Sequence, residues 1–421
     1  MRRSAGLLFM VVLLIGGFTT WAMAGEMLGP WLEPFSLSGW AEAIQSMRTH
    51  RPNDALTSRA RLRLEMSADF DAIYGFVSTD AEKNWQIDDE TGVDLQEAWL
   101  EYTAAGWDLR MGRQIIIWGK ADGVQITDIV SPPDYTESIT RDLDEIRMPV
   151  DAAKFRLLGD VVVTELIWIP VFEPAVQPEG DNPWAVETTL PENVHVTMAD
   201  PIEPDTSLEN SEIGLKAAAY LSGLDAAASV FYTWDDNPAY HRTLRIEGDD
   251  FFVDYAPQHH RLTVLGLEFS RPWSDYVFRG EAAYYIGKYH ETDTIALDPM
   301  QKDLFKWLVG VDWTPGNDWS VIAQFIVSHI IDHDARLADE AHESSVTLNV
   351  SKDLLHQTLT LSNMLYYDLN ENEIYIRPKA DYAVTDAFHF LMGADIFCGD
   401  DGDFGRYRNN SQVWVKAKYS F

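Results

Sequence analysis

The sequence has 421 residues, a formal net charge of −35 and one cysteine. So acidic a chain is poorly suited to nucleic acid, which we exclude as a partner, and one cysteine excludes an internal disulfide. The 15 Trp, 17 Tyr and 19 Phe are typical of a membrane protein with water-exposed loops rather than of a disordered chain.

We expect residues 1–24 to be a secretory signal peptide. Arg2 and Arg3 precede an apolar run, and Ala22-Met23-Ala24 has the small-x-small spacing of a cleavage site. The alternative is an uncleaved anchor helix, for which the apolar run is short. No cysteine stands directly after the cleavage site, so a lipid anchor is not expected.

The rest of the chain, 25–421, is predicted to be one all-β domain. Apolar and polar residues alternate with a period of two, which is typical of strands, and strong helical periodicity is absent. Eighteen segments show this alternation: 35–45, 57–67, 72–79, 92–103, 107–117, 151–158, 161–169, 209–221, 224–234, 261–270, 276–286, 304–313, 319–330, 344–352, 357–367, 373–383, 387–397 and 411–421.

The connections between these segments alternate in length. Links after even-numbered segments are short, such as "AAG", "SG" and "PGND", whereas many links after odd-numbered segments are long, such as 170–208 and 235–260. Short turns at one end and long loops at the other are the pattern of an up-and-down transmembrane β-barrel of the outer membrane. A soluble β-solenoid is the alternative, but it requires a repeat of fixed length, which the sequence lacks.

The last segment, "SQVWVKAKYSF", continues to the final residue, although chain ends usually fray. A closed barrel explains this, because the last strand then pairs with the first. Its alternation places Phe421 toward lipid at the rim and Lys416 and Lys418 toward the lumen. We expect the terminal aromatic to be the signal by which barrel-assembly machinery recognises the chain.

Residues 118–150 join the fifth and sixth predicted strands and form the third long loop. The segment contains apolar residues such as Val124, Ile126 and Ile146, and Pro132-Pro133 stiffens it. A loop of this length with apolar residues of its own is expected to fold, and its natural place is inside the barrel, where it narrows the lumen.

Charges of opposite sign are expected to face each other at this loop. The loop carries acidic residues, and the inward positions of several strands carry basic ones. The predicted pore-lining acids are Asp122, Asp128, Asp134, Glu137, Asp142, Asp144 and Glu145, and the predicted pore-lining bases are Arg61, Arg63, Lys154, Arg156, Arg377, Lys379, Lys416 and Lys418. Such an arrangement could select permeating ions by a transverse field. Equally, the same residues could be structural ion pairs that hold the loop.

No catalytic constellation and no metal site is predicted. His259-His260 is a candidate metal-ligating pair, but no further Cys, His or carboxylate at a suitable spacing completes a site. No cofactor is expected. Barrel enzymes of the lipase or protease type need a Ser-His or Asp-His pair, which no local motif supports.

The segment "GRQIIIWGKADGVQITDIVSPPDYTE", followed by "DEIRMPVDAAKF", resembles a Gram-negative outer-membrane family catalogued as a domain of unknown function. The family-motif residues are Gly112, Arg113, Gln114, Trp118 and Gly119, and further matches are Asp128, Pro132, Asp134, Pro149, Val150, Asp151 and Lys154. The family is similar to porins and is associated with lipid or hydrophobic-compound transport systems. The resemblance implies passage across the outer membrane, with an inner-membrane transporter or a periplasmic lipid carrier as a further partner.

The sequence therefore predicts a porin-like channel or exporter in the cell outer membrane, in contact with membrane lipid and lipopolysaccharide. Small or amphipathic solutes would pass through a lumen narrowed by an acidic loop that faces a basic wall. Two alternatives remain: a barrel enzyme of the lipase or protease type, and a surface receptor or adhesin with a plugged lumen that uses loops 170–208 and 235–260.

Overall fold

The computed structural model describes residues 34–137, 141, 143–186, 191–400 and 402–421. The predicted signal peptide lies outside the described residues. Within them, eighteen antiparallel strands form one continuous sheet. In order around the barrel they are β1 (Phe35–Arg48), β2 (Ser58–Phe70), β3 (Ile73–Asn84), β4 (Gly92–Ala104), β5 (Trp107–Gln114), β6 (Val150–Leu158), β7 (Val162–Ile169), β9 (Glu212–Leu221), β10 (Leu224–Trp234), β13 (Arg261–Trp273), β14 (Tyr276–Ile286), β17 (Leu304–Gly316), β18 (Trp319–Ile330), β19 (His342–Leu354), β20 (Leu359–Asp368), β21 (Ile374–Ala383), β22 (Phe388–Cys398) and β23 (Gln412–Ser420).

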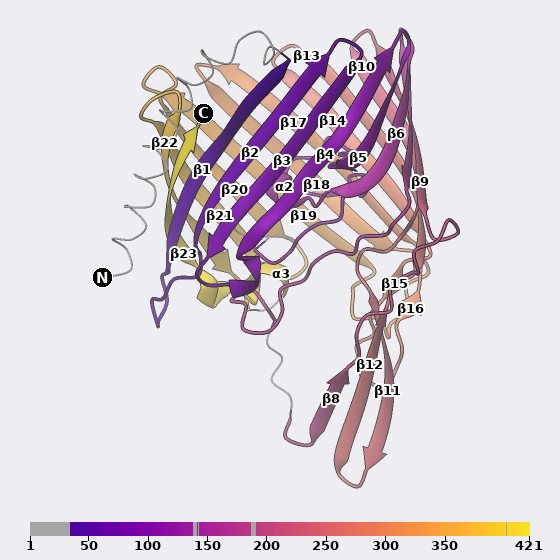
Figure 1. The fold of residues 1–421 in the computed structure, drawn as a ribbon. Coiled ribbons are helices and arrows are strands. Elements are labelled where there is room, and N and C mark those ends of the chain that lie inside the picture. Colours follow the sequence, from indigo (N-terminus) through magenta and orange to yellow (C-terminus); the bar gives the residue numbers. More distant parts are fainter. Residues whose placement is uncertain (1–33, 138–140, 142, 187–190, 401) are drawn as a thin grey trace.

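The sheet closes on itself, because β1 pairs with β23 in register from Trp40↔Ser420 to Arg48↔Gln412. Beyond the last pair, the backbone N–H groups of Gly39 and Phe421 each donate to the other's carbonyl, at 3.0 Å. The chain therefore ends within the closure seam, and the predicted eighteen-stranded barrel is confirmed (Figure 1).

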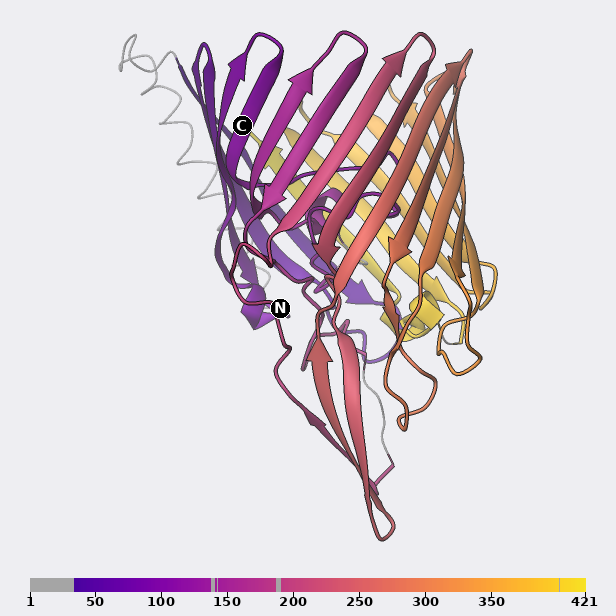
Figure 2. The same ribbon diagram turned by 90° about the vertical axis from the view of Figure 1, so that its right-hand side faces the viewer.

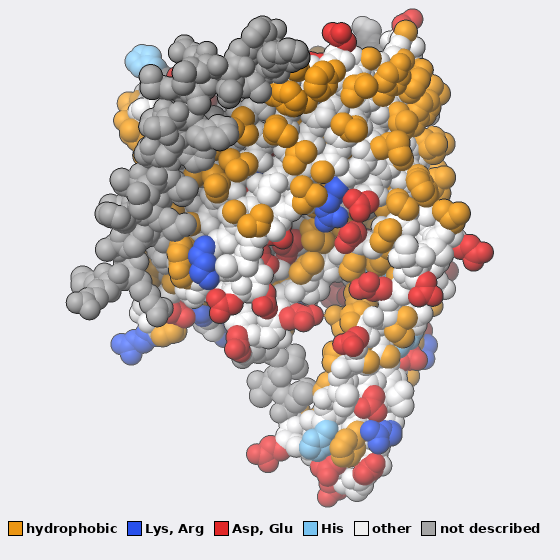
Figure 3. Space-filling model, in the orientation of Figure 1, with side chains coloured by type: hydrophobic (Ala, Val, Ile, Leu, Met, Phe, Trp, Pro, Cys, Tyr) orange, Lys and Arg blue, Asp and Glu red, His pale blue; other side chains and the backbone are white. Residues whose placement is uncertain are grey.

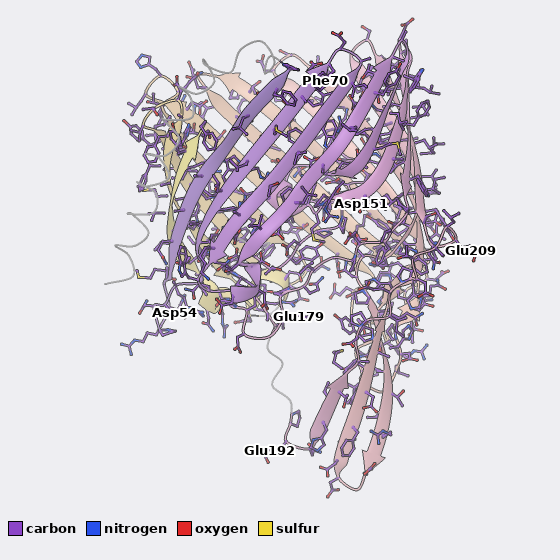
Figure 4. The ribbon with its side chains drawn as sticks, viewed as in Figure 1. Asp54, Phe70, Asp151, Glu179, Glu192 and Glu209 are labelled. Atoms are coloured by element: carbon purple, nitrogen blue, oxygen red, sulfur yellow. The ribbon has the colours of Figure 1, made fainter. Side chains whose placement is uncertain are left out.

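The two ends of the barrel differ as the sequence predicts. Figure 2 shows tight hairpins at one end and long connections at the other. At the β17–β18 hairpin, Asn317 and Asp318 have φ values of 51° and 60°, and such left-handed pairs fit the twist of two-residue hairpins. In Figure 4, Phe70 lies at the short-turn end, and Asp54 lies at the long-loop end.

Alternation along the strands separates the two faces of the wall. On β2, Leu64 and Met66 are exposed on the outside, whereas Arg61 is buried inside the barrel. Figure 3 shows apolar side chains concentrated toward the short-turn end, and acidic side chains toward the long-loop end. No helix among the described residues is long and apolar enough to cross a membrane.

Five further strands were not predicted from the sequence. Three of them, β8 (Val194–Met198), β11 (Ala239–Glu247) and β12 (Asp250–Gln258), form a separate sheet in which β8 runs parallel to β12. Figure 1 shows this sheet projecting away from the long-loop end. The other two, β15 (Tyr289–His290) and β16 (Met300–Gln301), make a small ladder. The connections also contain the helices α2 (Leu143–Ile146) and α3 (Gly402–Gly405) and the 3₁₀ turns η2 (Asp88–Glu90) and η3 (Arg408–Asn410).

Candidate functional site: the lumen and its loop

The loop between β5 and β6, residues 115–149, is attached to the inner side of β2. Arg59 and Glu137 form a salt bridge in which both side chains are 0% exposed. Arg61, two residues along the same strand face, lies 3.5 Å from Glu145. Charge pairs that are removed from water interact strongly when both partners are present. One side of the loop is therefore held by the strands next to the closure seam.

The same loop is bonded to the opposite side of the barrel. Glu281 on β14 accepts hydrogen bonds from the Lys120 N–H and from the Thr127 N–H and Oγ1, the last at 2.9 Å. Gln324 on β18 exchanges two hydrogen bonds with the Asp122 backbone, at 2.7 and 3.0 Å. Since β14 follows β2 by nine strands in a barrel of eighteen, the loop bridges opposite walls.

A third set of contacts, around Arg141 and Arg147, stabilises the fold of the loop. Arg141 lies 3.0 Å from Glu137 and 3.5 Å from Glu82 on β3. Arg147 donates to Asp128 at 2.7 Å and also pairs with Asp144. Two of the predicted acids are thus neutralised by the loop itself and not by the barrel wall.

The family-motif residues build the root of this loop. The Gln114 side chain is 0% exposed and donates to the Ala152 carbonyl at 3.0 Å. Trp118 is buried against Phe231; its backbone N–H donates to Asp128 at 3.1 Å and its indole N–H donates to Glu165 at 2.7 Å. These contacts fix the direction in which the chain leaves β5.

Both glycines of the motif are required by the backbone. Gly112 has a φ of 128°, and a Cβ there would lie 2.2 Å from the Ala98 carbonyl oxygen on β4. Gly119 has a φ of 97°, and its Cβ would lie 2.9 Å from Thr127 Oγ1 and 3.2 Å from the Glu281 carboxylate. Glycine alone adopts such angles without strain. Gly119 therefore allows the loop to lie directly against Glu281.

Other motif residues face outward or form turns. Arg113 donates to the Leu95 carbonyl at 3.2 Å and lies 3.4 Å from Glu173. Asp151 is exposed on the outside of β6, where Figure 4 labels it. Asp134 accepts the Thr136 N–H at 2.8 Å. These residues do not enter the contacts that join the loop to the opposite wall.

The predicted basic wall is only partly a partner of the loop. Arg61 pairs with Glu145 as described, and Lys416 lies 3.6 Å from the buried Glu42. Four of the other basic residues lie against their own wall: Arg63 binds Asp80 at 2.7 Å, Arg156 binds Asp108 at 2.8 Å, Lys418 lies over the Trp40 ring, and Lys154 is buried on β6. Asp142 lies outside the described residues.

Burial raises the pKa values of the acids in this network, whereas nearby basic residues lower them. Burial alone would raise the pKa of Glu145, but Lys416, Arg61 and Arg59 outweigh it and lower the pKa to about 2. Burial raises the pKa of Glu90, on η2, to about 7, against the opposing effect of Arg141. Glu145 is therefore a stable anion at neutral pH, whereas Glu90 titrates there.

Three cavities adjoin one another along the wall formed by β17 to β21. The outer chamber, about 660 Å³, and the middle chamber, about 450 Å³, share a lining that includes Asp235, Lys288, Glu343 and Asp368. The middle chamber and the inner chamber, about 600 Å³, share Val124, Tyr135, Tyr366 and Phe404, among others. The loop and the wall thus enclose a connected series of spaces.

The inner chamber lies deepest. Its wall includes Arg377 and Lys379, and its loop side includes Asp122, Arg141, Asp144 and Arg147. Lys379 is five residues from Ile374, where β21 starts at the long-loop end, which is about 16 Å along a strand.

The loop anchors that the sequence prediction missed are Arg59, Arg141, Glu281 and Gln324. Only Arg59 had a signal, because it shares the parity of Arg61 and Arg63.

The described residues contain no group of three or more His, Cys, Asp or Glu side chains arranged to hold a metal ion. His259, one of the candidate pair, is buried, and its Nδ1 lies 2.8 Å from the Asp235 carbonyl oxygen. His260 instead lies with its Nε2 2.8 Å from the Nε2 of His241. The two adjacent histidines therefore have different partners.

The fold defines the class: a closed eighteen-stranded antiparallel β-barrel. The chain belongs to the family described as "Protein of unknown function (DUF1302)", which matches residues 36–421. Its fold is similar to that of OccAB1 of Acinetobacter baumannii, with a TM-score of 0.54 and 10% identity over 92% of this chain and 96% of that one. OccD3 (OpdP) of Pseudomonas aeruginosa is similar too, with a TM-score of 0.53 and 10% identity over 92% and 91%. No curated protein matches the sequence.

Proposed function

We propose that the protein is a porin-like channel of the outer membrane, in which residues 115–149 form the constriction. The observation that carries this proposal is the attachment of one loop to opposite walls, through Arg59 and Arg61 on one side and Glu281 and Gln324 on the other. A loop anchored in this way divides the lumen and leaves the chambers beside β17 to β21 as the route for solutes.

The barrel fold supports the outer-membrane location. Exposed apolar side chains form the outside of the wall, as a lipid-facing surface requires, and acidic residues gather at the long-loop end. The long loops would then be external and the short turns periplasmic. Lipopolysaccharide would contact the outer rim, and Phe421 in the closure seam would serve the assembly machinery.

Conductance in planar bilayers tests the channel proposal. Replacement of residues 116–148 by a short Gly/Ser linker should raise the single-channel conductance several-fold, because the bridge across the lumen is removed. The matched control shortens a segment outside the lumen, the hairpin tip 243–254 between β11 and β12, and should leave the conductance unchanged. An intact barrel whose conductance does not respond to removal of the loop would contradict the proposal.

A further inference from the structure

The charges that line the inner chamber are not all neutralised. Arg141 is surrounded by Glu137, Glu82 and Glu90, and Arg147 is bound by Asp128 and Asp144. Arg377 has the buried Asp395 behind it, 3.4 Å away. Lys379, in contrast, forms no ion pair or hydrogen bond with another of the described residues. The chamber therefore presents one ammonium group that is available to a solute.

The part of the chamber lining nearer the long-loop end is aromatic and apolar. Phe404 packs against Tyr366 and Tyr375, with ring centroids 4.9 and 5.4 Å apart, and Val124 and Met364 complete this side. Tyr375 itself is buried, because it also stacks on Phe397 at 4.9 Å. The partly exposed rings of Tyr366 and Phe404, together with the aliphatic groups, form a surface of the kind that binds the apolar body of a ligand.

Phe404 is held in place by a buried carboxylate. Glu373, at the external end of β21, is 2% exposed and accepts the backbone N–H groups of Asp403, Phe404 and Gly405, at 2.9, 2.8 and 2.7 Å. Three such charge-assisted hydrogen bonds fix the short helix α3 over the chamber. The aromatic surface is therefore preformed and does not depend on a mobile side chain.

The approach to the chamber restricts the charge of what enters. The outer and middle chambers are lined by Asp235, Glu343, Asp368 and Asp403, against which Lys288 and Lys306 are the shared cations. Lys288 is already bound to Asp235, at 2.7 Å. An acidic mouth repels anions in proportion to their charge, so a multiply charged anion is disfavoured more than a monoanion.

We propose that the inner chamber binds an organic monocarboxylate with an apolar or aromatic body. Its carboxylate lies against the Lys379 ammonium, and its body lies against Tyr366 and Phe404. A volume of about 600 Å³ is in the range of small-molecule sites. This inference rests on the proposed channel function and names the class of solute for which the channel is selective.

Block of potassium chloride current by small probes tests this inference. Benzoate should reduce the single-channel current saturably, because it combines one carboxylate with an aromatic ring. Benzamide lacks the charge, acetate lacks the ring, and phthalate carries a second charge. Each of the three should be at least tenfold weaker than benzoate. Equal potency of benzoate and benzamide would overturn the inference.

Two substitutions assign the effect to the chamber. Lys379→Gln should weaken benzoate block at least tenfold, and Lys379→Arg should retain most of it. The matched control is Lys352→Gln, because Lys352 lies on β19, a strand that lines the chamber, but packs over Trp319 on the outer face of the wall. It should leave the block unchanged. Unaltered block in Lys379→Gln would overturn the assignment.

Binding can be measured without conduction. Titration of benzoate into the purified barrel, followed by calorimetry, should show one site that Lys379→Gln loses and Lys352→Gln keeps. A protein that conducts normally but binds no benzoate contradicts the solute class alone. A protein that binds benzoate but does not conduct contradicts the channel function alone.

Discussion

Arg59 of β2 and Glu137 of the β5–β6 loop form a salt bridge in which neither side chain has any solvent exposure. The two residues are 78 positions apart in the chain, so the pair links the β5–β6 loop to the inner side of the wall. Arg59 is additionally 3.9 Å from both Glu42 and Glu145. This fully buried pair attaches the loop at the closure seam.

Glu137→Gln should therefore release this side of the loop. The change leaves the Arg59 guanidinium buried without its principal anion, which costs about 3–5 kcal/mol in comparable cases. We expect a higher and noisier single-channel conductance and faster proteolysis within 115–149. The control is Asp144→Asn, since the Asp144 side chain is 88% exposed and its pair with Arg147 is worth little. Equal behaviour of the two variants would argue against the anchor.

Gly119→Ala should displace the loop from Glu281, its attachment on the opposite wall. Alanine at a φ of 97° is strained, at a cost of about 1–3 kcal/mol, and its Cβ would press against Thr127 and Glu281. We expect an increased conductance with the barrel intact. Gly92→Ala is the control, because a Cβ there would meet no atom within 4 Å. A wild-type conductance in Gly119→Ala would show that contact with Glu281 does not position the loop.

Acid should loosen the loop within a defined pH range. The pKa of Glu145 is lowered from 4.5 to about 2, so its stabilising effect is complete above pH 4.5 and is lost as the pH falls toward 2. We expect the wild-type conductance to rise over this range. Glu90, whose pKa is raised to about 7, is already protonated below pH 4.5 and does not contribute to this response.

Glu145→Gln should remove most of this response and should show the higher conductance already at neutral pH. Recordings at a series of pH values, made on both proteins under the same salt conditions, provide the comparison. A wild-type conductance that stays constant to pH 2.5 would count against Glu145 as a charged anchor.

Selectivity should depend on Lys379 more than on the other predicted basic residues. Arg63 is neutralised by Asp80, and Arg61 is close to Glu145, whereas Lys379 faces the inner chamber. Lys379→Gln should shift the reversal potential under a salt gradient toward cation selectivity, most clearly at low salt. Arg63→Gln should cause a smaller shift. The reverse order would show that the route runs beside β2 rather than β21.

Deletion of Phe421 should reduce the amount of assembled barrel. The deletion removes two backbone hydrogen bonds with Gly39 and the ring that stacks on Tyr419, at 6.3 Å. Heat-modifiable protein recovered from outer-membrane fractions measures assembly. Substitution by Trp keeps both the backbone and an aromatic ring and should restore the yield. Undiminished assembly after the deletion would separate closure of the barrel from the terminal residue.

The barrel could be predicted from the sequence because strand alternation and turn length are local properties. The inward orientation of Arg61, Arg377 and Lys416 likewise follows from the position of each residue in the alternation of its own strand. The partners of these residues could not be predicted, because they depend on where a distant loop lies. Asp128 and Asp144, for example, pair with Arg147 of the same loop and not with basic residues of the wall. Glu281 binds the loop through backbone N–H groups, which every residue except proline has and which therefore give no sequence signal.

The projecting sheet shows a different limit. Apolar and polar residues alternate less clearly along β11 and β12 than along the wall strands. The two strands also belong to a sheet of only three strands. The parallel pairing of β8 with β12 joins segments more than 50 residues apart, so no turn motif in the sequence predicts it. From the sequence alone, 170–208 and 235–260 are therefore expected to be long loops.

The size of the narrowest passage tests the central claim most directly. Uncharged polyethylene glycols of graded mass, added during single-channel recording, lower the conductance only when they enter the lumen. The account predicts that the protein with residues 116–148 replaced admits polymers that the wild type excludes, whereas the 243–254 control has the wild-type cut-off. The same cut-off in all three proteins would contradict a constriction formed by the β5–β6 loop.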